Sequence, residues 1–382
     1  MTRAYLDHAS SSPLRPVALA AMLPYLEGHP ADPGRVHSDG RVTRVAVEDA
    51  RAQVAALVGA RPREVVFTAT GTEAVNTAVW GAVTRGAERS TARGHVVTTA
   101  VEHSAVLESC HRSAADVTVV GVDTFGRFDA DAVLAACRPD TVLISVQLAN
   151  HEVGTIQTAL PDIVAGARSR DLLVHIDACA AAGHVPLDFR AVDADLCSIT
   201  GHKLGGPKGA AALLIRRGVR VPPLIVGGAQ ERARRAGIED VPAIVGFGAA
   251  AAELMTDDRL EAEAAAARAQ TADLLSAALA VPGVTQLGDP EARLPHLVCL
   301  AIAGVEAEPV LLGLDQHGVA VHSGSSCSSE TLEPSPVLAA MGVDADRSLR
   351  PSVGWDTTPT DVAAFGAAFS EVVGKLRALG RG

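Results

Sequence analysis

A lysine and an aspartate stand where they could anchor one cofactor. Lys203 follows the apolar run 194–199 and precedes a glycine-rich turn. A lysine held there loses its proton more easily than a solvated one and can form a Schiff base with a carbonyl carbon. Asp177 ends the apolar run 172–176, where its carboxylate can pair with a ring nitrogen. A single lysine after a strand is more often a solvated surface residue, but together the two residues indicate the anchors of pyridoxal phosphate (PLP).

Residues 64–74 read as a strand, a tight Thr/Gly turn and a helix start. Free backbone N–H groups at Gly71 and Thr72 would meet the positive end of the helix dipole there, which favours a phosphate. The alternative is that Thr72 is an ordinary helix N-cap. Thr200 and His202, on either side of the lysine turn, could donate to the same phosphate.

His103 and Arg350 are candidates for contacts with the cofactor ring and the substrate. His103 follows a strand and begins a helix, so its ring could stack on a planar cofactor and move protons near neutral pH, although a capping role is commoner. Arg350 interrupts the strand pattern 348–353. It is either a solvated edge residue or a fork that holds a substrate carboxylate with two parallel hydrogen bonds.

Cys327 differs in its surroundings from the other cysteines. It lies among small polar residues at 322–330, which predicts an exposed loop. Cys197 and Cys299 lie inside apolar runs, as buried core cysteines do. An exposed thiol with a lowered pKa is a nucleophile, so Cys327 is the candidate for that role.

The elements that would position these residues alternate along the chain. Apolar runs separated by Ala-rich helical stretches predict an α/β fold with a mostly parallel sheet and flanking helices, and cofactors bind at the carboxyl ends of such strands. The pattern at 241–280 predicts one long connecting helix. The predicted strands are 64–68, 95–98, 117–120, 141–146, 172–176, 195–199 and 210–215.

The C-terminal third predicts a smaller α+β domain. We expect a large cofactor-binding domain at 15–255 and a small domain formed by 1–14 with 256–382, which carries the Cys327 loop. The elements expected after the connecting helix are strands at 297–302, 319–322 and 348–353 and helices at 309–317, 335–341 and 359–379.

Composition limits the classes of function. A net charge of −11 and a pI near 5.6 argue against nucleic-acid binding through the overall field. The six cysteines form no Cys-x-x-Cys pair, which favours a reducing compartment over disulfides or a metal site. The chain starts without a basic-then-apolar leader and has no apolar run long enough for a bilayer, so we expect a cytoplasmic protein without membrane contact.

Taken together, these residues resemble the cysteine desulfurases, in the class V aminotransferase group of fold-type I PLP enzymes. The likeness runs from Tyr5 to the last helix, and the Cys327 loop is similar to that of the long-loop branch, which hands sulfur to protein acceptors. By overall likeness the chain resembles the desulfurases that supply sulfur for DNA phosphorothioate modification; iron–sulfur assembly is the other pathway. The landmarks in family order are 7–13, 32–33, 37, 40, 72–73, 102–103, 150–154, 177–178, 201–203, 206–209, 323–327 and 332–335.

The resemblance implies the roles of the candidate residues. PLP would be linked to Lys203, L-cysteine would bind through Arg350, and Cys327 would take the sulfur as a persulfide, leaving L-alanine. The catalytic residues would be Lys203, Cys327 and His103, in a homodimer that passes sulfur to an acceptor protein. The cofactor-binding residues would be Gly71, Thr72, His103, Asn150, His151, Asp177, Thr200, His202 and Lys203.

Four residues depart from the family pattern. His151 replaces an Asn, and Ala180 replaces a Gln, that contact the PLP phenolic oxygen. Either His151 or Asn150 would then be the donor to that oxygen. Ile238 replaces a Thr that reaches the partner subunit's phosphate, and Pro351 after the arginine is unusual. The alternatives are a selenocysteine lyase, an ordinary aminotransferase, which the cysteine loop disfavours, and a PLP-fold scaffold with weak or lost catalysis.

Overall fold

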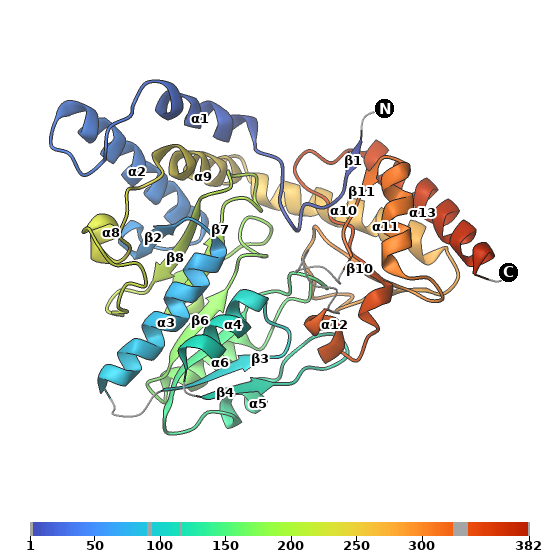
Figure 1. Ribbon diagram of the computed structural model, residues 1–382, viewed down its shortest axis with the longest axis horizontal. Coiled ribbons are helices and arrows are strands. Elements are labelled where there is room, and N and C mark those ends of the chain that lie inside the picture. The colour runs from blue at the N-terminus through green and yellow to red at the C-terminus, as the bar shows by residue number, and fades with distance from the viewer. Residues whose placement is uncertain (1–2, 90–93, 115, 324–334, 381–382) are drawn as a thin grey trace.

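A seven-stranded sheet forms the centre of the larger part of the chain. The computed structural model describes residues 3–89, 94–114, 116–323 and 335–380 (Figure 1). The strand order is β2-β8-β7-β6-β5-β3-β4, and only the pairs that β8 makes with β2 and β7 are antiparallel. The predicted mostly parallel sheet is confirmed. The strands are β2 (Val65–Thr68), β3 (His95–Thr99), β4 (Asp116–Val120), β5 (Thr141–Gln147), β6 (Leu173–Asp177), β7 (Leu196–Thr200) and β8 (Ala211–Ile215).

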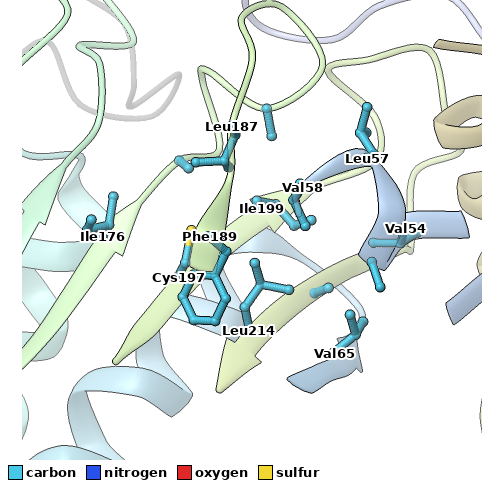
Figure 2. Packing of buried hydrophobic residues seen from close by; sticks show 14 of the residues in the cluster. Val54, Leu57, Val58, Val65, Ile176, Leu187, Phe189, Cys197, Ile199 and Leu214 are labelled. Carbon is cyan, nitrogen blue, oxygen red and sulfur yellow. The ribbon is translucent and has the colours of Figure 1, made fainter. Parts of the chain in front are cut away.

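Both faces of this sheet are covered by helices, which explains why its strands read as continuous apolar runs. Successive side chains alternate between the faces: Val65 and Phe67 join the cluster in Figure 2, whereas Val66 joins the cluster under α3 and α4. Helices α2, α6, α7 and α9 pack on the face of Val65. The helices of this part are α1 (Pro16–Glu27), α2 (Ser38–Leu57), α3 (Gly71–Arg89), α4 (Ser104–Ser113), α5 (Ala130–Ala135), α6 (Leu160–Arg168), α7 (Phe189–Val192), α8 (Gln230–Ala233) and α9 (Val241–Leu254).

A second core lies in the C-terminal part and includes the start of the chain. Ala4 and Leu6 belong to the same buried cluster as Phe365 and Phe369, because β1 (Ala4–Tyr5) pairs with β11 (Val319–Ala320). This membership supports the proposed small domain. Its other elements are the antiparallel strands β9 (Val284–Leu287), β10 (Cys299–Ile302) and β12 (Ser348–Leu349), with helices α10 (Arg259–Leu279), α11 (Ala307–Gln316), α12 (Pro336–Ala340) and α13 (Pro359–Leu379).

The predicted single helix over 241–280 is wrong. Helix α9 ends at Leu254 and α10 begins at Arg259, because Asp257 and Asp258 adopt left-handed backbone angles (φ 49° and 54°). Aspartate tolerates this conformation better than most residues, so nothing like a Gly or Pro marks the break in the sequence. None of the helices in the described ranges has the length and apolar character needed to cross a membrane.

Candidate active site

A cavity of about 400 Å³ opens at the carboxyl ends of β5, β6 and β7. It collects predicted residues that lie far apart in the sequence, which is the position expected for a ligand in such a sheet. Asn150 is absent from its lining, and Cys327 lies outside the described residues. The predicted residues that line the cavity are Gly71, Thr72, His103, His151, Asp177, Thr200, His202, Lys203 and Arg350.

Lys203 lies in the tight turn directly after β7, and its backbone is fixed from two sides. Its carbonyl accepts hydrogen bonds from Ser12 Oγ (3.0 Å) and from the ring Nε2 of His184 (3.1 Å). Gly205 ends the turn with φ 87°, and a Cβ there would lie 2.5 Å from Arg15 Cγ. The turn therefore requires glycine, and the lysine stays at the edge of the sheet beside the cavity.

Asp177 is the last residue of β6, the strand next to β7 in the sheet. Its Oδ1 accepts the N–H of Cys179 at 2.9 Å, which fixes the carboxylate at the cavity wall. The side chains of Thr200 and His202 are hydrogen-bonded to each other (Oγ1 to Nδ1, 2.8 Å). Burial, followed by the charge of Lys203, lowers the pKa of His202 to about 4, so this ring is neutral at pH 7.

The turn before α3 is shaped for an anion. Thr70, not Thr72, caps the helix, since its Oγ1 accepts the N–H of Glu73 at 3.0 Å. The amides of Gly71 and Thr72 come before this bonded amide in the first helical turn, where helices have no internal acceptor. A Cβ on Gly71 would lie 2.8 Å from Cys179 Sγ, so glycine is needed for the close approach. Both amides are thus available to a ligand phosphate.

Two histidine rings meet on another wall of the cavity. The rings of His103 and His151 are 5.0 Å apart and lie edge to face. His103 caps α4, with Nδ1 accepting the N–H of Ala105 at 3.0 Å, which places its proton on Nε2. Burial is the main cause that lowers the pKa of both rings, well below the usual value for His151. Both are therefore neutral donors at pH 7.

Asn150 has a structural role beside them. Its Nδ2 donates to the carbonyl of Val101 (3.0 Å), and its Oδ1 accepts the N–H groups of Glu152 and Val153 (2.8 Å each). The amide thus holds the turn that presents His151 to the cavity. Of the two residues considered as donors to the cofactor oxygen, the structure brings only His151 to the cavity.

Arg350 is buried, with 4% of its surface exposed, so the solvated alternative is wrong. Its Nη1 donates to the carbonyl of His151 (2.9 Å), and its Nη2 donates to Ser10 Oγ (2.8 Å) and lies 3.4 Å from Asp7 Oδ1. Its buried Nε has no hydrogen-bond partner within the described ranges. A guanidinium held in this way retains a donor for a bound carboxylate.

Gln147 and Ser10 line the cavity, although the sequence did not identify either as a site residue. Gln147 ends β5 and pairs in register with Asp177, and its Nε2 is buried without a partner among the described residues. The signal that could have identified Gln147 is its place at a strand end beside Asp177. The signal for Ser10 was its place in the family landmark 7–13, and the fold brings it in from the other end of the chain.

Four of the five cysteines within the described ranges make poor nucleophiles. Cys197 and Cys299 are buried core residues, as predicted, and burial raises the pKa of each. Burial also raises the pKa of Cys110 to about 12 and that of Cys179 well above its usual value. These four thiols remain protonated at neutral pH.

The family model described as aminotransferase class-V matches residues 4–365. The chain belongs to the aminotransferase class-V family. It is 38% identical to the cysteine desulfurase IscS of Methanosarcina thermophila, over 98% of this chain and 92% of that protein. A solved structure titled as a NifS-like protein matches with a TM-score of 0.90 and 28% identity, covering 98% of this chain and 100% of the other.

A further solved structure, titled SspA in complex with cysteine, has a TM-score of 0.76 and 27% identity. The match covers 92% of this chain and 99% of that one. Proteins of this family use PLP, and the cavity residues fit that group. Asp177 and Lys203 share one cavity wall, and the glycine that the turn at Gly71 requires leaves room for a phosphate.

Proposed function

We propose that this chain is a PLP-dependent cysteine desulfurase that converts L-cysteine to L-alanine and a persulfide on Cys327. The observation that carries the proposal is that Lys203, Asp177 and the buried Arg350 line one cavity, and that the Arg350 Nε has no partner among the described residues. Membership of the aminotransferase class-V family and likeness to named cysteine desulfurases support it. The arrangement suits an amino acid whose carboxylate is held while a proton leaves its α carbon.

On the cofactor side, each residue has a separate task. Thr200, His202 and the amides of Gly71 and Thr72 would hold the phosphate, and the Asp177 carboxylate would accept the ring N–H. Lys203 would hold the aldehyde carbon and, once the substrate amine has replaced it there, its free amine would take the α proton. PLP, when bound, supplies the electron sink for the electrons that this proton leaves behind.

On the substrate side, Arg350, which lines the cavity, would fix the carboxylate of L-cysteine. The neutral ring of His103 would lie over the reacting atoms as a proton donor through Nε2. His151 would also donate to the cofactor's phenolic oxygen, since its ring reaches the cavity and the Asn150 side chain does not.

The sulfur step needs a thiolate, which we assign to Cys327. Its Sγ would attack the substrate sulfur, the carbon–sulfur bond would break with its electron pair left on carbon, and a proton would then complete the methyl group of alanine. A Cys327 persulfide remains and passes sulfur to an acceptor protein, for iron–sulfur assembly or DNA sulfur modification. The high pKa values of the four thiols described above support this assignment.

The protein is proposed to act as a cytoplasmic homodimer. Exposed apolar side chains lie on α1, at the start of α2 and in the segment 225–238. Grouped apolar residues of this kind are typical of a protein–protein interface, whereas single exposed ones are not. Ile238 is 65% exposed and offers an apolar contact to a partner, but no hydrogen bond to its phosphate. The exposed apolar residues are Val17, Leu19, Leu23, Leu26, Val42, Val45, Ile225, Val226 and Ile238.

The function is tested with Cys327→Ser beside the parent, with Cys137→Ser as the matched control because Cys137 is partly exposed and lies outside the cavity. Each protein is given PLP, then L-cysteine together with a thiol reductant that cleaves the persulfide, and sulfide and alanine are measured. We expect the parent and Cys137→Ser to release both, and Cys327→Ser to bind PLP but release neither. Release of alanine and sulfide by Cys327→Ser at the parent rate would contradict the assignment, and a large preference for selenocysteine would indicate a lyase.

A further inference from the structure

The segment 227–237 is held in a conformation that few residues adopt. Glu231, Arg232 and Ala233 are consecutive non-glycine residues with left-handed backbone angles (φ 47°, 59° and 61°). Such a run persists only where the surroundings fix it. Here the buried Glu231 carboxylate accepts two bonds of 2.7 Å from Arg51, and a further 2.8 Å bond from the Phe67 N–H.

This fixed segment delivers Arg235 to the helix that starts at the phosphate turn. Arg235 Nε donates to Glu73 Oε1 at 2.9 Å, and its Nη2 lies 3.3 Å from Oε2. Glu73 Oε2 also accepts the N–H of Ala69 at 2.9 Å, on the other side of the turn. The Glu73 side chain is 13% exposed and that of Arg235 is 20% exposed, so water screens this pair only in part.

Glu73 poses an electrostatic problem for a phosphate site. A carboxylate in the first turn stabilises a helix that binds no anion, but it repels a phosphate bound at the same turn. Arg235 neutralises this carboxylate, and together with the Ala69 N–H it holds both oxygens in place. The other arginines of the segment have different partners: Arg232 pairs with the exposed Glu48, and Arg234 donates to the carbonyl of Arg63.

We propose that Arg235 is a positioning residue of the phosphate subsite, which acts through Glu73 to keep the first turn of α3 open to the phosphate of PLP. The inference rests on the proposed use of PLP. It predicts that Arg235 matters for the phosphate of the cofactor and not for its ring, because its partner Glu73 lies in the phosphate turn and Arg235 does not line the cavity.

The test compares PLP with pyridoxal, which has the same ring and aldehyde without the phosphate. Dissociation constants of both are measured by absorbance titration of the cofactor-free protein. In Arg235→Gln we expect the dissociation constant for PLP to rise roughly tenfold, because the Glu73 charge near the phosphate is no longer compensated. The dissociation constant for pyridoxal should stay unchanged. Arg232→Gln, which breaks a neighbouring exposed ion pair, should change neither constant.

Comparison of Glu73→Gln with Glu73→Gln/Arg235→Gln shows whether Arg235 influences PLP binding through Glu73. Without the carboxylate, Arg235→Gln should change PLP affinity less than about threefold, because no charge remains to be neutralised. If the double variant binds PLP as weakly as Arg235→Gln, the arginine does not act through Glu73 and the proposal is wrong. This pair of variants also gives the answer if Arg235→Gln alone fails to fold.

Two other outcomes overturn the proposal. Equal weakening of PLP and pyridoxal in Arg235→Gln would mean a general loss of structure, and an unchanged PLP constant would mean that Arg235 has no role at the site. Both differ from failure of the proposed function. In that case the parent protein itself would show no PLP binding and no adduct with Lys203 after borohydride reduction.

Discussion

The cofactor side of the cavity and its substrate side are built in different ways. On the cofactor side, Asp177 ends β6 and Lys203 follows the neighbouring strand β7, so one sheet fixes their separation. On the substrate side, Arg350 is held by Asp7 and Ser10 from the chain start and by the carbonyl of His151. One side depends on a continuous sheet and the other on distant segments that meet.

This difference predicts that cofactor binding and substrate binding can be separated by mutation. The sheet sets the separation of Asp177 and Lys203, and the Lys203 turn is held in addition by Ser12 and by His184, whose ring stacks on His296. Arg350, in contrast, is fixed only when the chain start and the C-terminal part are both docked. Ser335 adds a similar link, since its Oγ donates to the buried Glu152 at 2.7 Å, in the turn that carries His151.

The largest effect is expected for Lys203→Ala. Loss of the amine removes both the covalent link to the cofactor and the base for the α proton, so sulfide release should fall roughly 10³-fold or more. The control is Lys208→Ala, because Lys208 is an exposed lysine in the same glycine-rich segment. Borohydride reduction with peptide mapping should place the cofactor on Lys203 in the parent. A label on Lys208 would refute the assignment.

Arg350→Ala should separate the two sides. We expect KM for L-cysteine to rise roughly 10- to 100-fold, as for loss of a hydrogen bond to a charged group. The PLP dissociation constant should stay within about threefold of the parent, because Arg350 bonds the backbone carbonyl of His151, in a turn that Asn150 also holds. Steady-state kinetics and a PLP titration measure the two quantities. Loss of PLP together with activity would show that the two sides are not independent.

Glu102 gives a prediction about stability and pH on the cofactor side. Desolvation is the main cause that raises its pKa from 4.5 to about 8, the Asp177 charge raises it further, and bonds from Thr99 Oγ1 and the Gln147 N–H oppose the shift. Between about pH 4.5 and 8, Glu102 is therefore protonated in the folded protein and ionised in the unfolded chain. Its contribution to the unfolding free energy is full at low pH and is lost as pH rises through that window.

Glu102→Gln should remove this loss of unfolding free energy at higher pH, since the amide does not ionise. The unfolding free energy of the variant relative to the parent should increase by on the order of 3 kcal/mol between pH 5 and 8.5. Urea unfolding at several pH values measures it. The control is Glu108→Gln, because Glu108 is exposed on the following helix and should give a constant difference. A constant difference for Glu102→Gln as well would mean that this carboxyl is ionised in the folded protein.

The same comparison explains how much could be predicted from the sequence. The strands and the pair Asp177 and Lys203 followed from local patterns, because buried parallel strands are continuous apolar runs and their ends carry the site. The burial of Arg350 could not be predicted, since its partners Asp7 and Ser10 lie more than 300 positions away in the chain. Nor could the cap at Thr70, because Thr70 and Thr72 both suit that position by residue type.

The smallest expected effect concerns His151, which joins the two sides. Its ring lines the cavity beside His103, while its carbonyl accepts a bond from Arg350. Burial, and next the charges of His103, Lys203 and Arg350, keep its pKa well below 6.5, so the neutral ring has one N–H to donate. If that N–H reaches the phenolic oxygen of PLP, it stabilises the negative charge that remains when the Schiff base on Lys203 loses its proton.

Removing this donor should therefore raise the pKa of the Schiff base. In His151→Ala, we expect the visible absorption band to persist to higher pH than in the parent by roughly half a pH unit or more, since a neutral hydrogen bond contributes about 1 kcal/mol and one pKa unit corresponds to about 1.4 kcal/mol. The control is His111→Ala, which removes an exposed histidine at the far end of α4 and should leave the titration unchanged. The Arg350 bond to the residue 151 carbonyl survives the substitution, because it involves only the backbone, so KM for L-cysteine should change little. Superimposable titration curves for His151→Ala and the parent would place the ring away from the cofactor and leave residue 151 with its backbone role alone.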